Sequence, residues 1–311
     1  AEGDYFDYLT RFVHFDAIGP LKIVANGNFG LSYGLAKRFL ARLKCDQIEL
    51  VELNGQPDGN FPKGRPDPLQ QANREETSYK IRQVGADMGV AWDADGDRCY
   101  IYDELGEPLE GSHLTALLAV NLLRDSASIS GGGRTGEKVL HDPRNIWAIV
   151  ESVKQAGGVP LVNKAGHAFI KNRMKREDAL FAGELSGHYY FRDFFYADNG
   201  LIPFLLFLNI VSHANGPISA IVKPMRDKYF TSGEKNFEVA DKDGMIKKVE
   251  EQYADGSFDR TDGLSVTYDS WRLNLRPSNT ENLLRLNVEA KDREVCDQKT
   301  AELTALISNQ K

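Results

Sequence analysis

Short apolar runs alternate with longer amphipathic segments in the first third of the chain. Residues 21–25, 48–53 and 88–92 are short, mostly aliphatic runs, a pattern typical of buried strands. Apolar residues recur at helical spacing over 31–43, and a polar helix is predicted over 69–84. Because consecutive parallel strands need a long crossover connection, this order predicts a parallel sheet flanked by helices.

The same alternation repeats in the middle of the chain. It predicts helices over 112–124 and 145–156 and strands over 139–141 and 159–162. Ser112 is expected to cap the first of these helices, because its hydroxyl can accept a hydrogen bond from a free backbone N–H. Further helix and strand signals follow, which indicates a second α/β unit.

The last part of the chain has a different texture. Strands are predicted over 264–268, 271–275 and 283–288, with helices over 244–253 and 293–307. Adjacent strands with helices at the flanks are typical of an α+β module. The predicted fold class is α/β, with two consecutive mixed α/β domains and a C-terminal α+β domain at 1–104, 105–222 and 223–311.

The composition is that of a folded globular chain, with 41% hydrophobic and 27% charged residues. The formal net charge is −7. This balance argues against a nucleic-acid partner, because phosphate neutralisation needs clustered lysine and arginine. A few local basic residues can still bind a small anion, whatever the overall sign.

Cysteine usage and hydropathy bear on location. The three cysteines lie far apart without a CxxC motif, which is typical of a reducing, cytosolic compartment. The first residues show no basic stretch followed by an apolar one, so no signal peptide is expected. The longest strongly apolar stretch, 201–211, is shorter than the ~20 residues of a spanning helix and predicts a core helix. We therefore expect a cytoplasmic protein with no membrane partner.

The sharpest chemical feature is the loop Asp93-Ala-Asp-Gly-Asp-Arg98, which lies between two apolar runs. Alternate side chains of an extended segment point the same way, so Asp93, Asp95 and Asp97 could converge on one ion. Carboxylate oxygens suit a hard cation such as Mg²⁺. The end of a strand in an α/β sheet is also where ligands bind.

Two other interpretations of this loop compete with a metal site. An EF-hand loop would add Glu104 as its last ligand, but its sixth position requires Gly and is Arg98 here. A solvated acidic turn needs no ion, but three neighbouring carboxylates without a counter-ion raise one another's pKa. A metal site is the favoured interpretation.

A second polar loop, Gly183-Glu-Leu-Ser-Gly-His188, follows an apolar run and so comes at the end of a strand. Glu184, Ser186 and His188 alternate, so they could share one face and contact hydroxyl groups. A tight turn with incidental polar residues is the alternative. A protease site at Ser186 and His188 is weaker, because triads are defined by geometry and not by closeness in sequence.

A third loop joins two predicted strands, from Arg276 to Arg285. Its hydroxyl and amide groups can donate hydrogen bonds, and its backbone N–H groups can form an anion-binding nest, at Ser278, Asn279 and Thr280. The two arginines would add charge and bidentate geometry. A polar turn between exposed strands is the alternative.

The segment Lys164-Ala-Gly-His167 is a weaker candidate. His167 could contact a substrate, because imidazole titrates near neutral pH and can exchange protons. It could equally cap the helix that follows. The sequence favours neither interpretation.

Taken together, the loops at 93–98, 183–188 and 276–281 resemble the metal, sugar and phosphate loops of the α-D-phosphohexomutase family, in the family's order. The similarity covers nearly the whole chain and is greatest to the bacterial phosphomannomutase branch. The supporting segments are Pro57–Pro62, Pro66–Pro68, His141–Arg144, Lys164–Lys171, His188–Asp193 and Arg260–Gly263.

The resemblance implies an enzyme that moves phosphate between O6 and O1 of a hexose, here mannose, through a bisphosphate intermediate. It implies Mg²⁺ as cofactor, held by Asp93, Asp95 and Asp97, and a hexose phosphate as substrate. The implied catalytic residues are Arg98 and His167. The implied substrate-binding residues are Lys164, Glu184, Ser186, His188, Arg276, Ser278, Asn279, Thr280 and Arg285.

The resemblance also exposes an absence. Family members carry the transferable phosphate on a serine of a first domain, in a Thr-x-Ser-His-Asn-Pro-like loop, and this sequence contains no such loop. We expect the chain to correspond to domains two to four, without the N-terminal domain of the same polypeptide, and to be inactive alone. A natural three-domain protein is the alternative. Other functions left open are a phosphoglucomutase, a non-catalytic sugar-phosphate-binding protein and a metal-stabilised structural module.

Three positions depart from the family pattern. Ala94 stands where Gly is usual, which restricts the backbone mildly. Asn282 stands where Pro is usual in the phosphate loop. His141 stands where some relatives have Lys, which leaves one general-acid or phosphate-contacting role unassigned.

Overall fold

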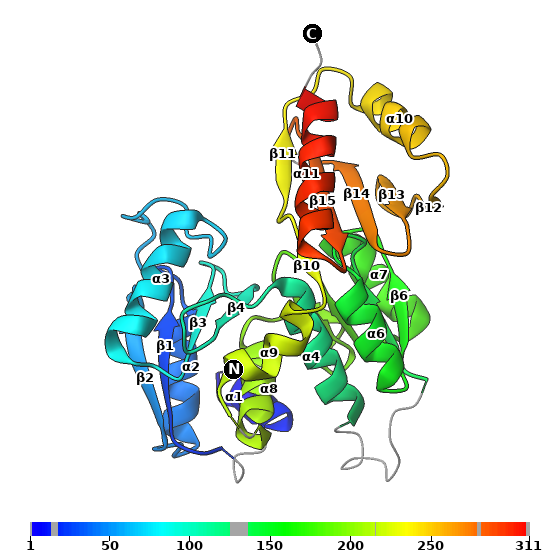
Figure 1. The fold of residues 1–311 in the computed structure, drawn as a ribbon. Helices are drawn as coiled ribbons and strands as arrows, with labels where there is room; N and C mark the ends of the chain where they lie inside the picture. The colour runs from blue at the N-terminus through cyan, green and yellow to red at the C-terminus, as the bar shows by residue number, and fades with distance from the viewer. Residues whose placement is uncertain (1, 14–17, 125–135, 215, 279–280, 309–311) are drawn as a thin grey trace.

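The computed structural model describes residues 2–13, 18–124, 136–214, 216–278 and 281–308. Figure 1 shows three sheet-containing units that follow one another along the chain. This arrangement confirms the predicted class of two mixed α/β units followed by an α+β unit. The exact domain boundaries stay a prediction.

The first unit is a sheet in the order β2-β1-β3-β4. β1, β2 and β3 pair in parallel, and β4 runs antiparallel to β3. Phe39 of one helix packs with Ile23 on one face, and Ile81 of another packs with Val24 on the other face. The elements are α1 (Glu2–Leu9), η1 (Thr10–Phe12), β1 (Leu21–Asn26), α2 (Ser32–Arg42), β2 (Ile48–Leu53), α3 (Gln71–Val84), β3 (Met88–Trp92) and β4 (Cys99–Tyr102).

The second unit is a sheet in the order β6-β5-β7-β8-β9. β6, β5 and β7 are parallel, whereas β8 and β9 are antiparallel additions. Its elements are α4 (Gly111–Arg124), β5 (Lys138–His141), α6 (Trp147–Gln155), β6 (Val159–Val162), α7 (His167–Glu177), β7 (Phe181–Gly183), β8 (Tyr189–Phe191), η3 (Arg192–Phe194), β9 (Ala197–Asp198), α8 (Leu201–His213) and α9 (Ile218–Arg226).

Ser112 lies inside α4 and does not cap it, so that prediction is wrong. The helix begins one residue earlier, at Gly111, and the Ser112 hydroxyl donates to the Glu110 carboxylate at 3.2 Å. A Cβ at Gly111 would lie 2.7 Å from the carbonyl oxygen of Leu185. The start of α4 therefore packs against the loop 183–188, and only glycine permits that approach.

The third unit is an antiparallel sheet in the order β10-β15-β14-β13-β12, with β11 also paired to β15. Met245 and Val249 of one helix and Cys296 and Leu303 of another pack into its core. Three short strands, β10 to β12, were not predicted from the sequence. The elements are β10 (Phe230–Thr231), β11 (Lys235–Phe237), α10 (Lys242–Gln252), β12 (Ser257–Asp259), β13 (Leu264–Thr267), β14 (Trp271–Pro277), β15 (Leu284–Ala290) and α11 (Arg293–Ser308).

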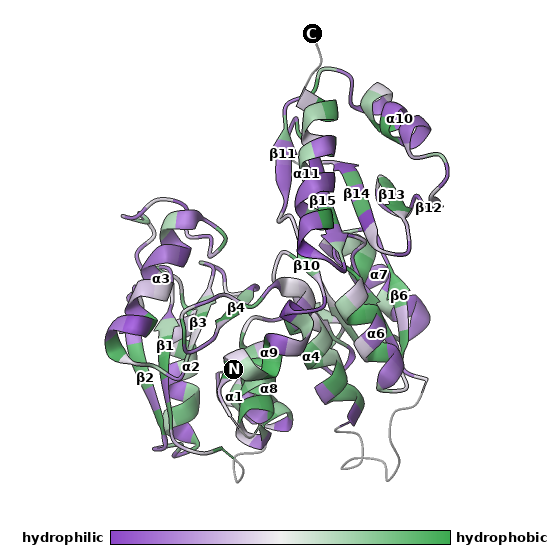
Figure 2. Ribbon diagram, in the orientation of Figure 1, coloured by the Kyte–Doolittle hydropathy of each residue, from purple (hydrophilic) through white to green (hydrophobic). Residues whose placement is uncertain are grey.

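One hydrophobic cluster runs through both of the first two units. Its centre is α8, which is buried from Leu201 to Asn209 and is coloured as apolar along most of its length in Figure 2. The Trp92 indole N–H donates to the Gly200 carbonyl at 2.8 Å, and the Trp92 ring lies edge-on to Phe204. The shared core fixes the end of β3 relative to the second sheet, and so positions the loops that follow each sheet.

α8 is the predicted core helix. Among the described residues, no single helix is long and apolar enough to cross a membrane. α8 and α9 meet those criteria only as a pair, with a bend of 99° between them. All three cysteines are buried free thiols.

Candidate active site

The loop 93–98 connects β3 to β4 at the carboxyl end of the parallel strands. Asp93 is buried, Asp97 is partly buried and Asp95 is exposed. One carboxylate oxygen of each lies within 4.8 Å of the others, so the predicted convergence of three carboxylates is what the structure shows. Gly30 is required beneath the loop, because a Cβ there would lie 2.3 Å from the Ala94 carbonyl oxygen.

These three residues fit a hard divalent cation. Asp97 Oδ1 is buried and has no hydrogen-bond partner among the described residues. Burial raises the pKa of Asp93 to about 7, against the opposing effect of Arg98. A buried oxygen without a partner costs free energy, and a cation beside it would remove that cost. The donor set is all-oxygen, which is the preference of Mg²⁺.

Arg98 holds this loop in shape. Its Nε donates to Asp93 Oδ2 at 2.5 Å, and its Nη1 donates to Asp67 Oδ1 at 3.1 Å. Asp67 is buried and comes from the Pro66–Pro68 segment of the first unit. The guanidinium therefore offsets the charge of two buried carboxylates in this structure, and its predicted catalytic role stays a prediction.

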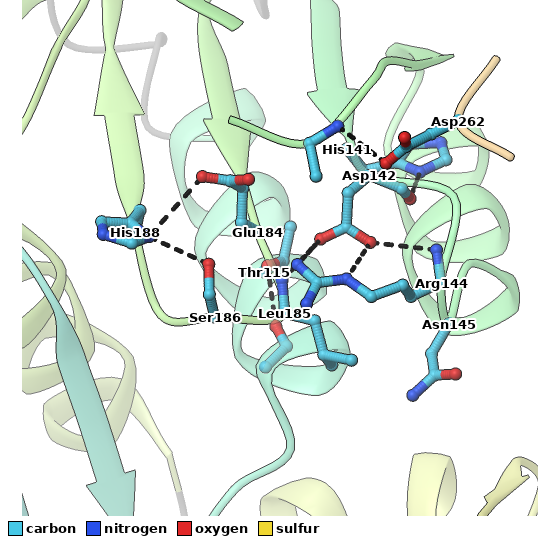
Figure 3. A network of polar contacts seen from close by, with 12 residues as sticks. Thr115, His141, Asp142, Arg144, Asn145, Glu184, Leu185, Ser186, His188 and Asp262 are labelled. Atoms are coloured by element: carbon cyan, nitrogen blue, oxygen red, sulfur yellow. Dashed lines mark hydrogen bonds and ion pairs between the residues drawn. The ribbon is translucent and has the colours of Figure 1, made fainter. Parts of the chain in front are cut away.

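The second loop places its polar residues side by side, as Figure 3 shows. His188 Nδ1 lies 2.9 Å from Ser186 Oγ and 3.6 Å from Glu184 Oε2. The buried Glu184 carboxylate accepts from the Gly166 backbone N–H at 2.9 Å and from the Tyr190 hydroxyl at 2.8 Å. The shared face predicted from their alternation is present, with Glu184 fixed by two donors.

The first two loops meet although they belong to different sheets. Arg98 and His188 form an isolated antiparallel bridge, and the Cys99 N–H donates to the Gly187 carbonyl at 3.0 Å. His188 Nε2 lies 3.5 Å from Asp97 Oδ2. The candidate metal loop and the candidate sugar loop therefore form one continuous site.

His167 is the first residue of α7 and joins the same site. The helix has no side-chain cap, so the capping interpretation of His167 is wrong. Its Nδ1 lies 2.8 Å from Asp198 Oδ2, and this hydrogen bond raises the pKa of His167. Lys164 places its ammonium over the Phe169 ring, 4.8 Å from the centroid, and makes a cation–π contact there.

The third loop gathers positive charge. Arg276 on β14 and Arg285 on β15 lie opposite each other, and both contact the Glu234 carboxylate, at 3.1 and 3.3 Å. The Nε atoms of both arginines are buried without a hydrogen-bond partner in the described part of the chain. Ser278 accepts from the Glu281 N–H at 3.2 Å. Asn279 and Thr280 lie outside the described residues.

Sequence reasoning missed Arg144, which joins this cluster. It forms a bidentate pair with Asp142, at 2.9 and 2.6 Å, and its Nη1 lies 3.6 Å from Glu234. Both members of the pair are buried, and Asp142 also accepts from the Leu185 N–H at 2.7 Å. The His141 side chain is buried and bonds the Asp142 carbonyl instead. The sequence did contain a signal for this pair, because Asp142 and Arg144 stand two positions apart directly after a strand.

A cavity of about 340 Å³ lies where the three units meet. Its lining includes Tyr100 from the first unit, Arg144 and Leu185 from the second, and Glu234 from the third. The three aspartates do not line it. The cavity therefore opens at the arginine end of the site, beside the loop 183–188.

The domain models of one known family match most of the chain. Residues 3–106, 110–229 and 234–305 match the family models for phosphoglucomutase/phosphomannomutase alpha/beta/alpha domain II, alpha/beta/alpha domain III and C-terminal domain. Over 309 residues the chain is 42% identical to the phosphohexose mutases of Xanthomonas campestris and 40% identical to the phosphomannomutase of Escherichia coli K12. These alignments cover 97% and 98% of this chain and 66% of each relative.

A solved structure shows the same arrangement. A phosphoglucomutase/phosphomannomutase family protein from Burkholderia thailandensis superposes with a TM-score of 0.80 at 26% identity. The superposition covers 99% of this chain and 65% of that one. The chain thus spans just under two thirds of the length of the relatives that it matches.

Proposed function

The chain belongs to the phosphoglucomutase/phosphomannomutase family, and we propose that it supplies the metal, sugar and phosphate sites of a mutase that interconverts mannose 1-phosphate and mannose 6-phosphate. One observation carries the proposal. The loop 183–188 touches the carboxylate cluster through His188 and the arginine cluster through Leu185 and Asp142. A hexose held by this loop would have one end near each cluster.

The acidic residues would form the metal-binding end of the site. Asp93, Asp95 and Asp97 would hold Mg²⁺, which supplies positive charge beside the phosphoryl group that is transferred. Arg98 fixes the orientation of the Asp93 carboxylate by a hydrogen bond to its Oδ2 atom. Because phosphoryl transfer depends mainly on positioning and charge, a fixed carboxylate cluster is the part of the site that the chemistry most needs.

The opposite end would bind the phosphate that is not transferred. Arg144, Arg276 and Arg285 already converge on the Glu234 carboxylate, an anion that occupies the place we assign to phosphate. Arginine forks bind phosphate and carboxylate with the same geometry. Glu184 and Ser186 would bind the sugar hydroxyls between the two ends. His167, oriented by Asp198, would hold or move a proton at those hydroxyls.

A phosphoglucomutase is the second candidate, since the matched family models carry both names. Glu184 and Ser186 would contact hydroxyl groups that mannose and glucose share. Calorimetric titration with mannose 1-phosphate and glucose 1-phosphate compares the two sugars directly. Saturable binding of neither would contradict a sugar-phosphate function and would favour a metal-stabilised structural module.

Turnover is expected to need a further domain. We propose that the phosphate-carrying serine lies outside these 311 residues, because the sequence contains no Thr-x-Ser-His-Asn-Pro-like loop. The purified 311-residue chain should then show no conversion of mannose 1-phosphate in a coupled assay, even with Mg²⁺ and a hexose bisphosphate. Addition of a separately expressed first domain should restore activity. Turnover by a sample whose mass matches these 311 residues would overturn this part of the proposal.

The metal assignment predicts the effect of Asp95→Asn. Because Asp95 is exposed and lies in a loop, the variant should fold normally. Loss of one of three carboxylate charges should weaken Mg²⁺ binding by roughly tenfold or more. Replacement of a residue that only hydrogen-bonds a metal ligand already lowers metal affinity by at least about tenfold, and Asp95 would be a ligand itself. Calorimetric titration with Mg²⁺ measures the change.

Asp46→Asn is the matched control for that experiment. Asp46 is an exposed aspartate of the same unit, but it precedes β2 and so lies at the opposite edge of the sheet. Its replacement should leave the Mg²⁺ affinity unchanged. Equal affinity in both variants would remove Asp95 from the site.

The phosphate assignment predicts the effect of Arg276→Ala. Loss of a charge-assisted hydrogen bond should weaken mannose 1-phosphate binding by about 1.5–3 kcal/mol. Binding of unphosphorylated mannose should barely change, because Arg276 would contact only the phosphate. Titration with both ligands separates these effects, and equal losses would mean that Arg276 supports the loop rather than the ligand.

Glu234→Gln is the informative counterpart. It removes the carboxylate that contacts all three arginines and keeps the shape of the side chain. Without that competing anion, mannose 1-phosphate should bind more tightly than to the unaltered chain. Weaker binding would contradict the placement of phosphate among the arginines.

A further inference from the structure

Two histidines face each other beside the aspartate loop. His167 and His188 pack edge to face, with ring centroids 4.5 Å apart. Together with Asp97 they form a group in which one ligand atom of each residue lies within 4.8 Å of the others. The three residues come from α7, the loop before β8 and the loop before β4, so the shared core of the first two units holds them together.

The Nδ1 atom of each imidazole ring already has a partner. His167 Nδ1 lies 2.8 Å from Asp198 Oδ2, and Lys171 fixes the other oxygen of that carboxylate at 2.7 Å. A carboxylate can only accept, so Nδ1 carries a proton, and in the neutral ring Nε2 then has the lone pair that a metal ion needs. His167 therefore has the carboxylate–imidazole arrangement that orients metal-binding histidines.

In His188 a serine hydroxyl takes the place of the carboxylate as the partner of Nδ1. Its Nδ1 contacts Ser186 Oγ at 2.9 Å and faces the Glu184 carboxylate at 3.6 Å. Its Nε2 points toward Asp97 Oδ2 at 3.5 Å. In a tetrahedral zinc site, bonds of about 2.0–2.1 Å place neighbouring ligand atoms about 3.4 Å apart. The His188–Asp97 spacing is already close to that value.

We propose that Asp97, His167 and His188 form a second metal site, which binds Zn²⁺ or Co²⁺ rather than Mg²⁺. Imidazole nitrogen is a preferred ligand of these ions, whereas Mg²⁺ selects oxygen. Three protein ligands leave a fourth position for water or a substrate oxygen.

This site and the three-aspartate site share Asp97, whose Oδ1 is buried without a hydrogen-bond partner among the described residues. One carboxylate drawn toward the histidines is less available to the other two aspartates. We therefore expect Zn²⁺ and Mg²⁺ to compete for the chain. The inference does not depend on the proposed mutase activity, because it concerns metal binding alone.

Titration of the 311-residue chain with Co²⁺ tests the proposal. Co²⁺ bound by two imidazoles and a carboxylate should give visible absorption that Zn²⁺ abolishes by displacement and that excess Mg²⁺ weakens. His167→Ala and His188→Gln should each lower the Co²⁺ affinity at least tenfold. Asp198→Asn, which removes only the partner of His167, should lower it as well.

Two controls separate this site from other metal binding. His213→Ala removes an exposed histidine at the end of α8 and should leave the Co²⁺ titration unchanged. Asp95→Asn should weaken Mg²⁺ binding but change the Co²⁺ affinity less than either histidine variant. Co²⁺ binding that survives both histidine variants, or that is lost only with Asp95→Asn, would overturn the proposal and place the ion among the aspartates.

A measurement on the unaltered chain covers variants that fail to fold. Co²⁺ is paramagnetic, so it should broaden or shift the imidazole proton signals of two histidines before the others. The His213→Ala spectrum, which lacks the signal of an exposed histidine, identifies one of the signals that should be affected last. Uniform effects on all histidine signals would contradict a specific site.

Discussion

Replacement of Asp142 by alanine should lower the free energy of unfolding by about 3–5 kcal/mol, the cost of removing one partner from a buried ion pair. Asp142 and Arg144 are both buried, and their two hydrogen bonds measure 2.9 and 2.6 Å. The variant would leave Arg144 buried, and its remaining ion-pair partner among the described residues would be Glu234, at 3.6 Å. It would also leave the Leu185 N–H without its acceptor.

The same change should weaken mannose 1-phosphate binding, because Asp142 connects Arg144 to the loop 183–188. Urea denaturation measures the stability, and calorimetry measures the affinity. The double variant Asp142→Ala/Arg144→Met is the control, since it removes the uncompensated charge. It should recover part of the stability and none of the phosphate binding. If Asp142→Ala alone is as stable as the unaltered chain, the pair is not a structural element of the site.

The pH dependence follows from the same pair. Burial opposes ionisation of Asp142, but Arg144 and two backbone donors hold its pKa at about 2, below the ordinary value of 3.8. A depressed pKa means that the stabilisation is present above pH 3.8 and is lost as the pH falls toward 2. The difference corresponds to about 2 kcal/mol. Denaturation curves across that pH range should show a larger loss of stability in the unaltered chain than in the double variant.

The parts of the structure that the sequence predicted are set by neighbouring residues. The strands at 48–53, 88–92 and 159–162 have their predicted ends, because apolar runs and turn residues act locally. The convergence of Asp93, Asp95 and Asp97 also follows from spacing within one loop. The prediction of a Ser112 cap was wrong because α4 already begins at Gly111, where the distant Leu185 carbonyl packs too close for any side chain.

The features that could not be predicted from the sequence depend on contacts between distant segments of the chain. Arg144 and Glu234 are far apart in sequence and meet only because the third sheet packs on the second. Asp67 reaches Arg98 across the long loop before α3. Hydrophobic periodicity within one segment carries no information on such distant pairs. Arg276 and Arg285 could be predicted because they flank one loop, but the Glu234 carboxylate that they contact could not.

Glu289→Ala is also expected to lower the stability strongly. Glu289 belongs to the third unit, and it binds the backbone of the second unit next to Arg144. Its carboxylate accepts from the Ile146 and Trp147 N–H groups, at 2.9 and 3.1 Å, at the start of α6. Its neighbour across the sheet, Arg272, lies 3.7 Å away and donates to the carbonyls of Pro143 and Arg144. Both side chains are fully buried.

Burial raises the pKa of Glu289 to about 7 and lowers that of Arg272, so each charge depends on the other. Removal of the carboxylate leaves a buried guanidinium and two free N–H groups. We expect a loss of about 3–5 kcal/mol in the free energy of unfolding. Glu289→Gln, which keeps one acceptor of the same shape, should lose less.

The mannose 1-phosphate affinity distinguishes a role in the site from a role in the fold alone. Arg272 donates to the carbonyls of Pro143 and Arg144, so its displacement should move the Arg144 guanidinium away from Glu234. Phosphate binding should therefore fall in Glu289→Ala under conditions where circular dichroism shows the variant to be folded. Val266→Ala is the matched control, because it creates a cavity in the core of the third unit away from this contact. It should lower stability without changing the affinity, and a parallel loss of affinity in both variants would mean that the third unit acts only through its overall stability.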